Sequence, residues 1–93
     1  MRIITEARVR EFMERVPRSA EAMSRWAETI ESAKWRNPSD LKATFGSASF
    51  VGDLTVFNVG GNKYRVLAFI HYRNQAVYIK KLGTHKEYDQ WDL

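Results

Sequence analysis

The sequence contains no cysteine and no long apolar run. Without cysteine the chain lacks a disulfide scaffold, a thiolate zinc site and a cysteine nucleophile, so packing must supply its stability. No apolar run approaches the roughly 20 residues that a membrane-spanning helix needs. The opening residues Met1–Ile4 turn polar too soon for a signal peptide. We therefore expect a cytoplasmic protein without a membrane segment.

Acidic residues are scarce in the second half of the chain. Residues 1–53 hold nine Lys or Arg against eight Asp or Glu, whereas residues 54–93 hold six against three. No acid falls between Asp53 and Glu87. Such asymmetry indicates a surface for a polyanion, of which nucleic acid is the usual one. The alternative is a solvated sheet face whose lysines discourage edge pairing.

The overall composition is that of a soluble globular protein. Of the 93 residues, 44% are hydrophobic and 28% are charged, unlike a disordered or membrane chain. A chain of this length buries one core and is too short for a second independent unit. We predict a single domain, residues 1–93, with one functional site.

The N-terminal part predicts two amphipathic helices, because its apolar residues recur at i, i+3, i+4 and i+7. They are Val9, Phe12, Met13 and Val16 in the first helix, and Met23, Trp26, Ala27 and Ile30 in the second. Thr5 and Ser19 occupy N-cap positions, and residues 17–19 form a turn between the two helices. Asn37 and Pro38 end the second helix, so we expect a helical hairpin.

Residues 38–53 read as a connector rich in Ser, Gly and Asp, with Leu41, Phe45 and Phe50 as anchors on the core. Ile3 and Ile4 are expected to form a short strand at the edge of a sheet.

The C-terminal half predicts a meander of three strands. The strands are residues 54–59, 63–72 and 76–82, joined by turns at 60–62 and 73–75. Gly83 ends the last strand, and Thr84–Glu87 fits a capping box that opens a short final helix. The predicted fold class is α+β, with the helical hairpin packed on one face of a small antiparallel sheet and a short C-terminal helix.

Alternation along residues 64–73 assigns side chains to two faces of the central strand. Tyr64, Val66, Ala68, Ile70 and Tyr72 suit the helices, and Arg65, Leu67, Phe69, His71 and Arg73 lie opposite. The second face is partly apolar, carries cations at both ends and has no remaining helix to cover it. Phosphate there would feel a strong field. The alternative for Arg65 is an ion pair with an acid from the helices or the tail.

Two residues after the last strand are candidates for chemistry. His85 lies where a strand turns into a helix, and a neutral imidazole there can exchange a proton with a ribose hydroxyl or a leaving oxygen. Tyr88 is the aromatic residue most suited to touch an RNA base. His71, in mid-strand, reads as a hydrogen-bonded half-buried residue. His85 and Asp89 share i, i+4 spacing, but two ligands fall short of a metal site, so we expect neither metal nor cofactor.

Three stretches, "LKATFG" at 41–46, "VFNVGGNKYRV" at 56–66 and "LGTHKEYD" at 82–89, resemble the HigB toxins of bacterial toxin–antitoxin pairs. The resemblance covers nearly the whole chain. It implies a RelE-like fold and a metal-independent endoribonuclease that cuts mRNA, often at the ribosome, by 2′-hydroxyl attack. It also implies that Arg65 grips the scissile phosphate and that His85 lies near a second basic position of the site.

The resemblance is incomplete in one strand. RelE-like toxins have lysines there, whereas this chain has Val56 and Asn58. The general base is therefore open, with Lys63, Lys80 or Lys81 as compensating residues. Strand register decides whether Lys80 or Lys81 shares the face of Arg65. The predicted catalytic residues are Arg65, His85 and Tyr88, and the predicted RNA contacts are Asn58, Lys63, Arg73, Lys80, Lys81 and Lys86.

Toxins of this kind have partners, and the resemblance implies a cognate helix-turn-helix antitoxin of the HigA type. Operator DNA would be bound only through that antitoxin. Trp35, Trp91 and Leu93 are candidate contact points for it. The rival interpretation is a non-catalytic module that binds RNA or protein through the same basic face. A small-molecule enzyme has little support, because paired carboxylates and a nucleophile constellation are absent.

Overall fold

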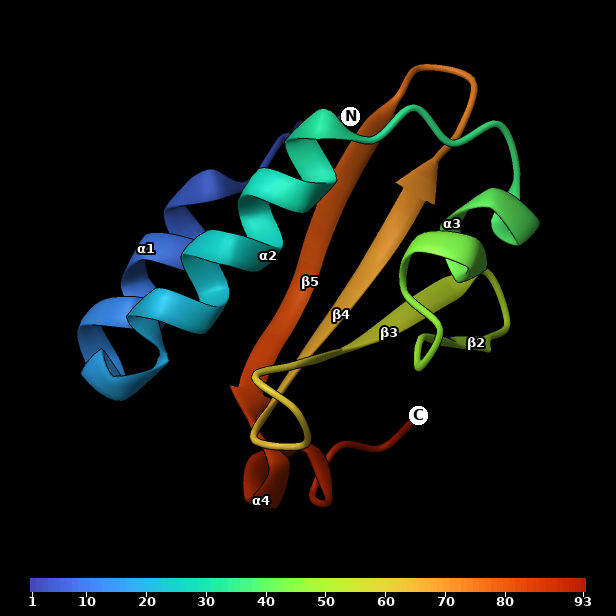
Figure 1. The fold of residues 1–93 in the computed structure, drawn as a ribbon. Helices are drawn as coiled ribbons and strands as arrows, with labels where there is room; N and C mark the ends of the chain where they lie inside the picture. Colours follow the sequence, from blue (N-terminus) through green and yellow to red (C-terminus); the bar gives the residue numbers. More distant parts are fainter.

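The computed structural model describes residues 1–93. Its elements follow in the order β1 (Arg2–Ile3), α1 (Glu6–Arg15), a 3₁₀ turn (Pro17–Ser19), α2 (Ala20–Ser32), α3 (Pro38–Thr44), β2 (Ser49–Val51), β3 (Leu54–Val59), β4 (Tyr64–His71), β5 (Ala76–Thr84) and α4 (His85–Tyr88). Figure 1 shows α1 and α2 lying side by side along one face of the sheet, and α4 below the end of β5. This α+β arrangement confirms the predicted RelE-like architecture.

The sheet has five strands in the order β1-β5-β4-β3-β2. The predicted meander is confirmed as the antiparallel pairs β3–β4 and β4–β5. The N-terminal edge strand is also confirmed, but it runs parallel to β5, with Arg2 opposite Ala76 and Ile3 opposite Val77. The sheet is therefore mixed: its meander is antiparallel as predicted, and the sequence did not indicate the parallel direction of the edge strand. Parallel pairing follows because the long path through both helices and three strands returns β5 in the direction of β1.

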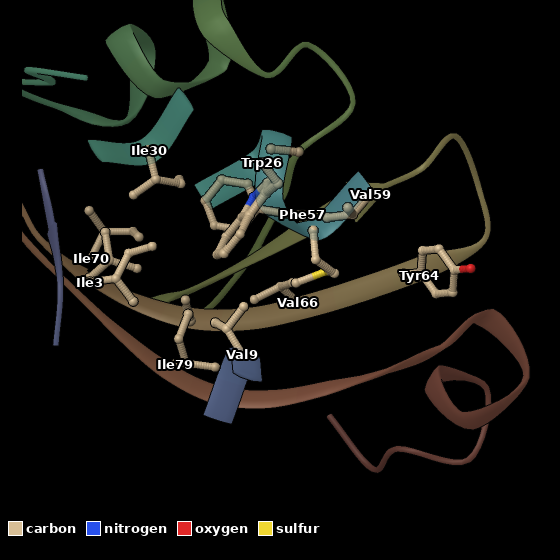
Figure 2. Packing of buried hydrophobic residues seen from close by; sticks show 14 of the residues in the cluster. Ile3, Val9, Trp26, Ile30, Phe57, Val59, Tyr64, Val66, Ile70 and Ile79 are labelled. Carbon is tan, nitrogen blue, oxygen red and sulfur yellow. The ribbon is translucent and has the colours of Figure 1, made fainter. Parts of the chain in front are cut away.

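The core lies between the helical hairpin and one face of the sheet. Figure 2 shows Val9 and Trp26 from the helices meeting Phe57, Val66 and Ile79 from the strands. The Trp26 and Phe57 rings pack edge to face with centroids 5.4 Å apart. The apolar periodicity of the helices and the alternation along β4 both predicted this face.

The helix N-termini differ from the prediction in their hydrogen bonds. Thr5 and Ser19 are the N-cap residues of α1 and α2 by position, but neither side chain caps its helix. Thr5 Oγ1 instead accepts a 2.8 Å hydrogen bond from the backbone N–H of Ile79. Ser19 Oγ donates to the carbonyl of Val16 at 2.7 Å. Tertiary and turn contacts thus use the hydroxyls that local sequence assigned to caps.

The connector 38–53 is more ordered than predicted. It contains helix α3, which begins after Asn37 because Asn37 Oδ1 accepts a 2.9 Å hydrogen bond from the N–H of Asp40. It also contains the edge strand β2. Leu41 and Phe45 pack against the core as expected, but Phe50 is 44% exposed and anchors nothing. Pro38 occupies the first position of α3. The second helix, α2, already ends at Ser32, so the prediction that Asn37 and Pro38 end it was wrong.

The junction of β5 and α4 is shifted from its predicted position. The strand runs through Gly83 to Thr84, and α4 is His85–Tyr88. The predicted capping box is present: Thr84 Oγ1 accepts from the N–H of Glu87 at 3.2 Å, and Glu87 Oε1 accepts from the N–H of Thr84 at 2.9 Å. No helix in the structure has both the length and the apolar character needed to cross a membrane.

Candidate functional site

The sheet face turned away from α1 and α2 carries the candidate site. Asn58, Arg65 and Gly83 lie directly opposite one another on β3, β4 and β5, so their Cβ positions point to the same side. Val56 and Leu67 lie on the same side, two residues further along, and are 1% and 3% exposed. We call this side of β3, β4 and β5 the site face. Its floor is dry and apolar around the single guanidinium.

Arg65 is buried, with 7% exposure, and has no carboxylate partner. The ion pairs of the structure involve Arg15, Arg25, Arg36 and His85. Arg65 Nη1 donates to the carbonyls of Asn62 and Tyr64, each at 3.1 Å. The other two guanidinium nitrogens make no hydrogen bond within the chain and are not fully enclosed. An oriented donor pair of this kind fits two oxygens of a phosphate.

Tyr88 lies against this guanidinium. The Arg65 Cζ atom is 5.2 Å from the centroid of the Tyr88 ring, within the range of a cation–π interaction. Helix α4 has only four residues, too few to be stable alone. The capping box therefore contributes to placing Tyr88 over Arg65.

His85 lies beside the same end of β4. Its backbone N–H donates to the carbonyl of Lys63 at 2.8 Å. This hydrogen bond fixes the start of α4 beside Lys63, which lies two residues before Arg65 in the sequence. The side chain of His85 is half exposed, and its Nδ1 atom is 3.4 Å from Asp89 Oδ2. A carboxylate at that nitrogen orients the imidazole. His85 is thus open to solvent and available for proton exchange.

A β-bulge decides which lysine shares the face of Arg65. Leu67 pairs with Lys81 whereas Ala68 pairs with Ile79, so Lys80 is the extra residue of β5. Lys81 lies on the site face, and its Nζ atom is 5.7 Å from the centroid of the Trp91 ring. The carbonyl of Lys80 accepts a 3.0 Å hydrogen bond from Arg8 at the edge of β5. The bulge settles the open choice of register in favour of Lys81.

The remaining predicted RNA contacts are spread over the surface. Asn58 is opposite Arg65, and its Nδ2 donates to the carbonyl of Ser47 at 3.3 Å. Lys63 and Lys86 are exposed near Arg65 and His85. Arg73 lies in the turn between β4 and β5, eight residues from Arg65; at about 3.3 Å per residue it is roughly 26 Å away. The fold therefore places Asn58, Lys63, Lys81 and Lys86 toward the Arg65 end of the sheet, whereas Lys80 lies at the edge of β5 and Arg73 at the far end of β4.

His71 has the structural role expected of it. Its Nδ1 accepts a 3.2 Å hydrogen bond from the N–H of Asn74, and it lies at the same distant end of β4 as Arg73. No group of three or more His, Cys, Asp or Glu side chains is arranged to hold a metal ion.

Sequence reasoning missed a tie between α1 and α4. Arg15 Nη1 and Nη2 donate to the two carboxylate oxygens of Glu87 at 2.9 and 3.2 Å. The hydrogen bond from Arg15, followed by that from the backbone of Thr84, lowers the pKa of Glu87 below its ordinary value. The partners are 72 residues apart, and no local pattern could have indicated the contact.

Sequence reasoning also missed the position of Trp91. Its ring lies over Gly83, where an added Cβ atom would be 2.9 Å from Trp91 Cζ2. The Trp91 and Tyr88 rings meet edge to face with centroids 5.4 Å apart. The signal available in the sequence was the three-residue spacing of Tyr88 and Trp91, which lets the two rings meet. Trp35, by contrast, is buried, and Leu93 is exposed.

A helical hairpin on one face of a small sheet, with an unpaired arginine on the other, defines a RelE-like toxin fold. Comparison with known proteins agrees. Residues 19–91 match the HigB toxin family, described as the RelE-like toxic component of a toxin–antitoxin system. The mRNA interferase toxin HigB of Escherichia coli strain K12 is 35% identical over 92 residues, which covers 96% of this chain and 88% of that protein. The mRNA interferase HigB of Shigella flexneri matches with the same identity and coverage. The chain belongs to the HigB family of toxins.

Proposed function

We propose that this toxin is an mRNA interferase, an endoribonuclease that cuts mRNA at the site face and thereby stops translation. Membership of the HigB family makes the chain the toxic component of a toxin–antitoxin system. Its relatives in Escherichia coli and Shigella flexneri carry the name mRNA interferase. The activity resides in one domain, residues 1–93, acting in the cytoplasm.

The observation that carries the proposal is the buried arginine without an acid partner. Placing a guanidinium on an apolar floor costs free energy unless a counter-charge binds there. Two backbone carbonyls and the Tyr88 ring satisfy only part of Arg65. An RNA phosphate would complete its hydrogen bonds, and the low polarity around Val56 and Leu67 strengthens that attraction.

The chemistry follows from the RNA and these side chains. The ribose 2′-hydroxyl loses its proton and attacks the adjacent phosphorus while the bond to the 5′-oxygen breaks, leaving a 2′,3′-cyclic phosphate and a 5′-hydroxyl. Arg65 stabilises the charge that builds on the non-bridging oxygens. His85, exposed and oriented by Asp89, either accepts the proton of the 2′-hydroxyl or donates a proton to the leaving 5′-oxygen, and water completes the other transfer. Because the nucleophile belongs to the RNA, the reaction we propose needs no metal.

Other residues of the proposed site bind and orient the RNA. Tyr88 orients Arg65 and offers its free surface to a base, while Asn58, Lys63, Lys81 and Lys86 contact the backbone around Arg65. Lys80 and Arg73 lie further out, so contacts there require a longer stretch of RNA. We place the reaction on ribosome-bound mRNA. A helix-turn-helix antitoxin of the HigA type would block the toxin, and operator DNA would be reached only through that partner.

The test is Arg65→Ala against a matched control. Arg25→Ala also removes one arginine, but this residue is exposed on α2 and pairs with Glu21. We expect Arg65→Ala to abolish growth arrest and the appearance of new 5′ ends in translated mRNA, with Arg25→Ala remaining fully toxic. Thermal unfolding of both purified variants checks that the fold persists. Full toxicity of folded Arg65→Ala would refute the proposed site. RNA binding by the native protein without any new 5′ ends would instead favour the non-catalytic module.

A further inference from the structure

Two adjacent aromatic rings lie between two cations on the site face. Tyr88 lies 5.2 Å from Arg65, Trp91 lies 5.4 Å from Tyr88, and Lys81 lies 5.7 Å from Trp91. We call Arg65, Tyr88, Trp91 and Lys81 the cation–aromatic row. The proposed function gives roles to Arg65 and Tyr88 and a general backbone contact to Lys81, but no role to Trp91.

Gly83 makes room for the third member of the row. A Cβ atom at that position would meet Trp91 Cζ2 at 2.9 Å and Glu87 Cβ at 3.1 Å, so only a residue without Cβ lets the indole come this close to β5. Trp91 is nevertheless only half buried. Part of its ring surface is therefore free beside Arg65. Trp26 and Trp35, by contrast, are buried, with 4% and 3% exposure.

The row leads into an open groove. Strand β1 pairs only with Ala76 and Val77, so the C-terminal half of β5 has a free edge. A groove of about 500 Å³ runs along this edge, lined by Arg8, Glu11, Phe12, Arg15, Lys80, Lys81, Leu82 and Trp91. Arg15 is held by Glu87 and Arg8 by the carbonyl of Lys80. Lys80 and Lys81 have no carboxylate partner within the chain.

We propose that Trp91 and Lys81 form a subsite for the nucleotide one position beyond the two that flank the cleaved bond, with the indole stacking on its base and the ammonium binding its phosphate. Single-stranded nucleic acid is bound by aromatic surfaces on which bases stack, next to cations that follow the backbone. The row supplies both, with its two rings between its two cations, and Lys80 of the groove continues the positive path. The subsite deepens the proposed function and rests on it for the position of the cleaved bond at Arg65.

The test compares two uncleavable probes, a 2′-O-methylated hexanucleotide of mixed sequence and a 2′-O-methylated dinucleotide with one phosphate. The hexanucleotide spans Arg65 and the subsite, whereas the dinucleotide reaches only one of them. Because Trp26 and Trp35 are buried, quenching of tryptophan fluorescence on binding reports Trp91. We expect quenching by the hexanucleotide, and loss of that quenching in Trp91→Phe although binding persists.

Affinities of the variants separate stacking from structural support. Trp91→Ala should weaken the hexanucleotide about tenfold, the effect of losing one stacked base, and the dinucleotide less than about twofold. Trp91→Phe should retain most of the affinity. Lys81→Ala should lower the salt dependence of hexanucleotide binding by about one counterion, and Arg25→Ala should leave that slope unchanged. Inorganic polyphosphate, which has no bases, should bind equally well to the native protein and to Trp91→Ala.

Three results would overturn the subsite: no quenching by the hexanucleotide, equal weakening of both probes in Trp91→Ala, or the same loss of polyphosphate binding. The second would mean that the indole only supports Tyr88. These results differ from failure of the proposed function. A protein that binds the hexanucleotide through Trp91 but cuts no mRNA retains the subsite and loses the nuclease. A protein that cuts mRNA while Trp91→Ala binds normally retains the nuclease and loses the subsite.

Discussion

The two faces of the sheet use the same strand for opposite purposes. Toward the helices, β4 presents Tyr64, Val66, Ala68 and Ile70 to a continuous core of 19 buried residues. Toward the other side it presents Arg65 on a floor formed with Val56 and Leu67. No charged side chain is buried on the helix face, whereas the site face buries that of Arg65 without an acid. Burial of apolar side chains on the helix face stabilises the fold. Burial of Arg65 on the site face instead strengthens the electrostatic field of an unpaired charge.

The way in which the two faces are covered also differs. Two helices of 10 and 13 residues cover the core. Each helix buries its apolar face against the core, and this burial stabilises the helix. Only the four-residue α4 and the chain after it lie against Arg65 and Lys81. That short segment depends on the capping box and on the Arg15–Glu87 pair. Function at the site face should therefore respond to changes that hardly affect stability.

The largest effect should come from the helix face. Phe57 is fully buried and packs edge to face on Trp26 and Phe45, with centroids 5.4 and 5.2 Å apart. We expect Phe57→Ala to lower the free energy of unfolding by about 3–5 kcal/mol, because an aromatic side chain is lost from a packed core. Urea denaturation followed by circular dichroism measures this. A loss below about 1 kcal/mol would show that the helix face is not the main source of stability.

The matching change on the site face is Arg65→Lys, which retains the charge but replaces the planar fork by a point charge. We expect mRNA cleavage to fall about 100-fold or more, as when one oriented donor to a developing oxyanion is lost. The thermal midpoint should stay within a few degrees of the native value. Cleavage rates in a translation reaction, set beside thermal unfolding of the same sample, give both quantities. A parallel loss of stability and activity would erase the distinction between the faces.

A smaller effect should follow from removing the ion pair that links α1 to α4. Arg15→Ala removes the partner of Glu87 without touching Arg65, His85 or Tyr88. We expect cleavage to fall about tenfold and the amides of residues 85–91 to exchange hydrogen faster. The free energy of unfolding should change by less than about 1 kcal/mol, because the pair is exposed. Arg15→Lys should recover part of the activity. An unchanged exchange rate at α4 would show that the capping box holds the helix unaided.

The smallest effect is a pH dependence at Glu87. Its pKa is lowered from an ordinary value of 4.5, first by the hydrogen bond from Arg15, so the folded state favours the carboxylate. The stabilisation is present above about pH 4.5 and is lost as the pH falls through the lowered value in the folded state. The native protein should thus exceed Glu87→Gln in thermal midpoint at neutral pH, and the gap should narrow near pH 3. A gap that widens on acidification would contradict this sign.

Local patterns predicted much of the fold. Helical spacing identified α1 and α2, strand alternation identified the core face of β4, and the "THKE" stretch identified the capping box of α4. These features depend on neighbours within about four residues, so the sequence expresses them directly. The prediction for the connector, residues 38–53, missed helix α3 because Pro38 was interpreted only as the end of a helix, whereas it is the first residue of α3. The hydroxyls of Thr5 and Ser19 do not cap their helices because Thr5 bonds to the distant Ile79 and Ser19 bonds to Val16 in the preceding turn.

For the site, the sequence by itself determined that Arg65 would interrupt an apolar strand in a half of the chain poor in acids. It also placed His85 and Tyr88 directly after the last strand. Only the tertiary structure decided that Arg65 has no acid partner, that a bulge turns Lys81 to its side, and that Trp91 lies over Gly83. The physical reason is range: strand register, ion pairing and ring packing join residues that are brought together only when the chain has folded.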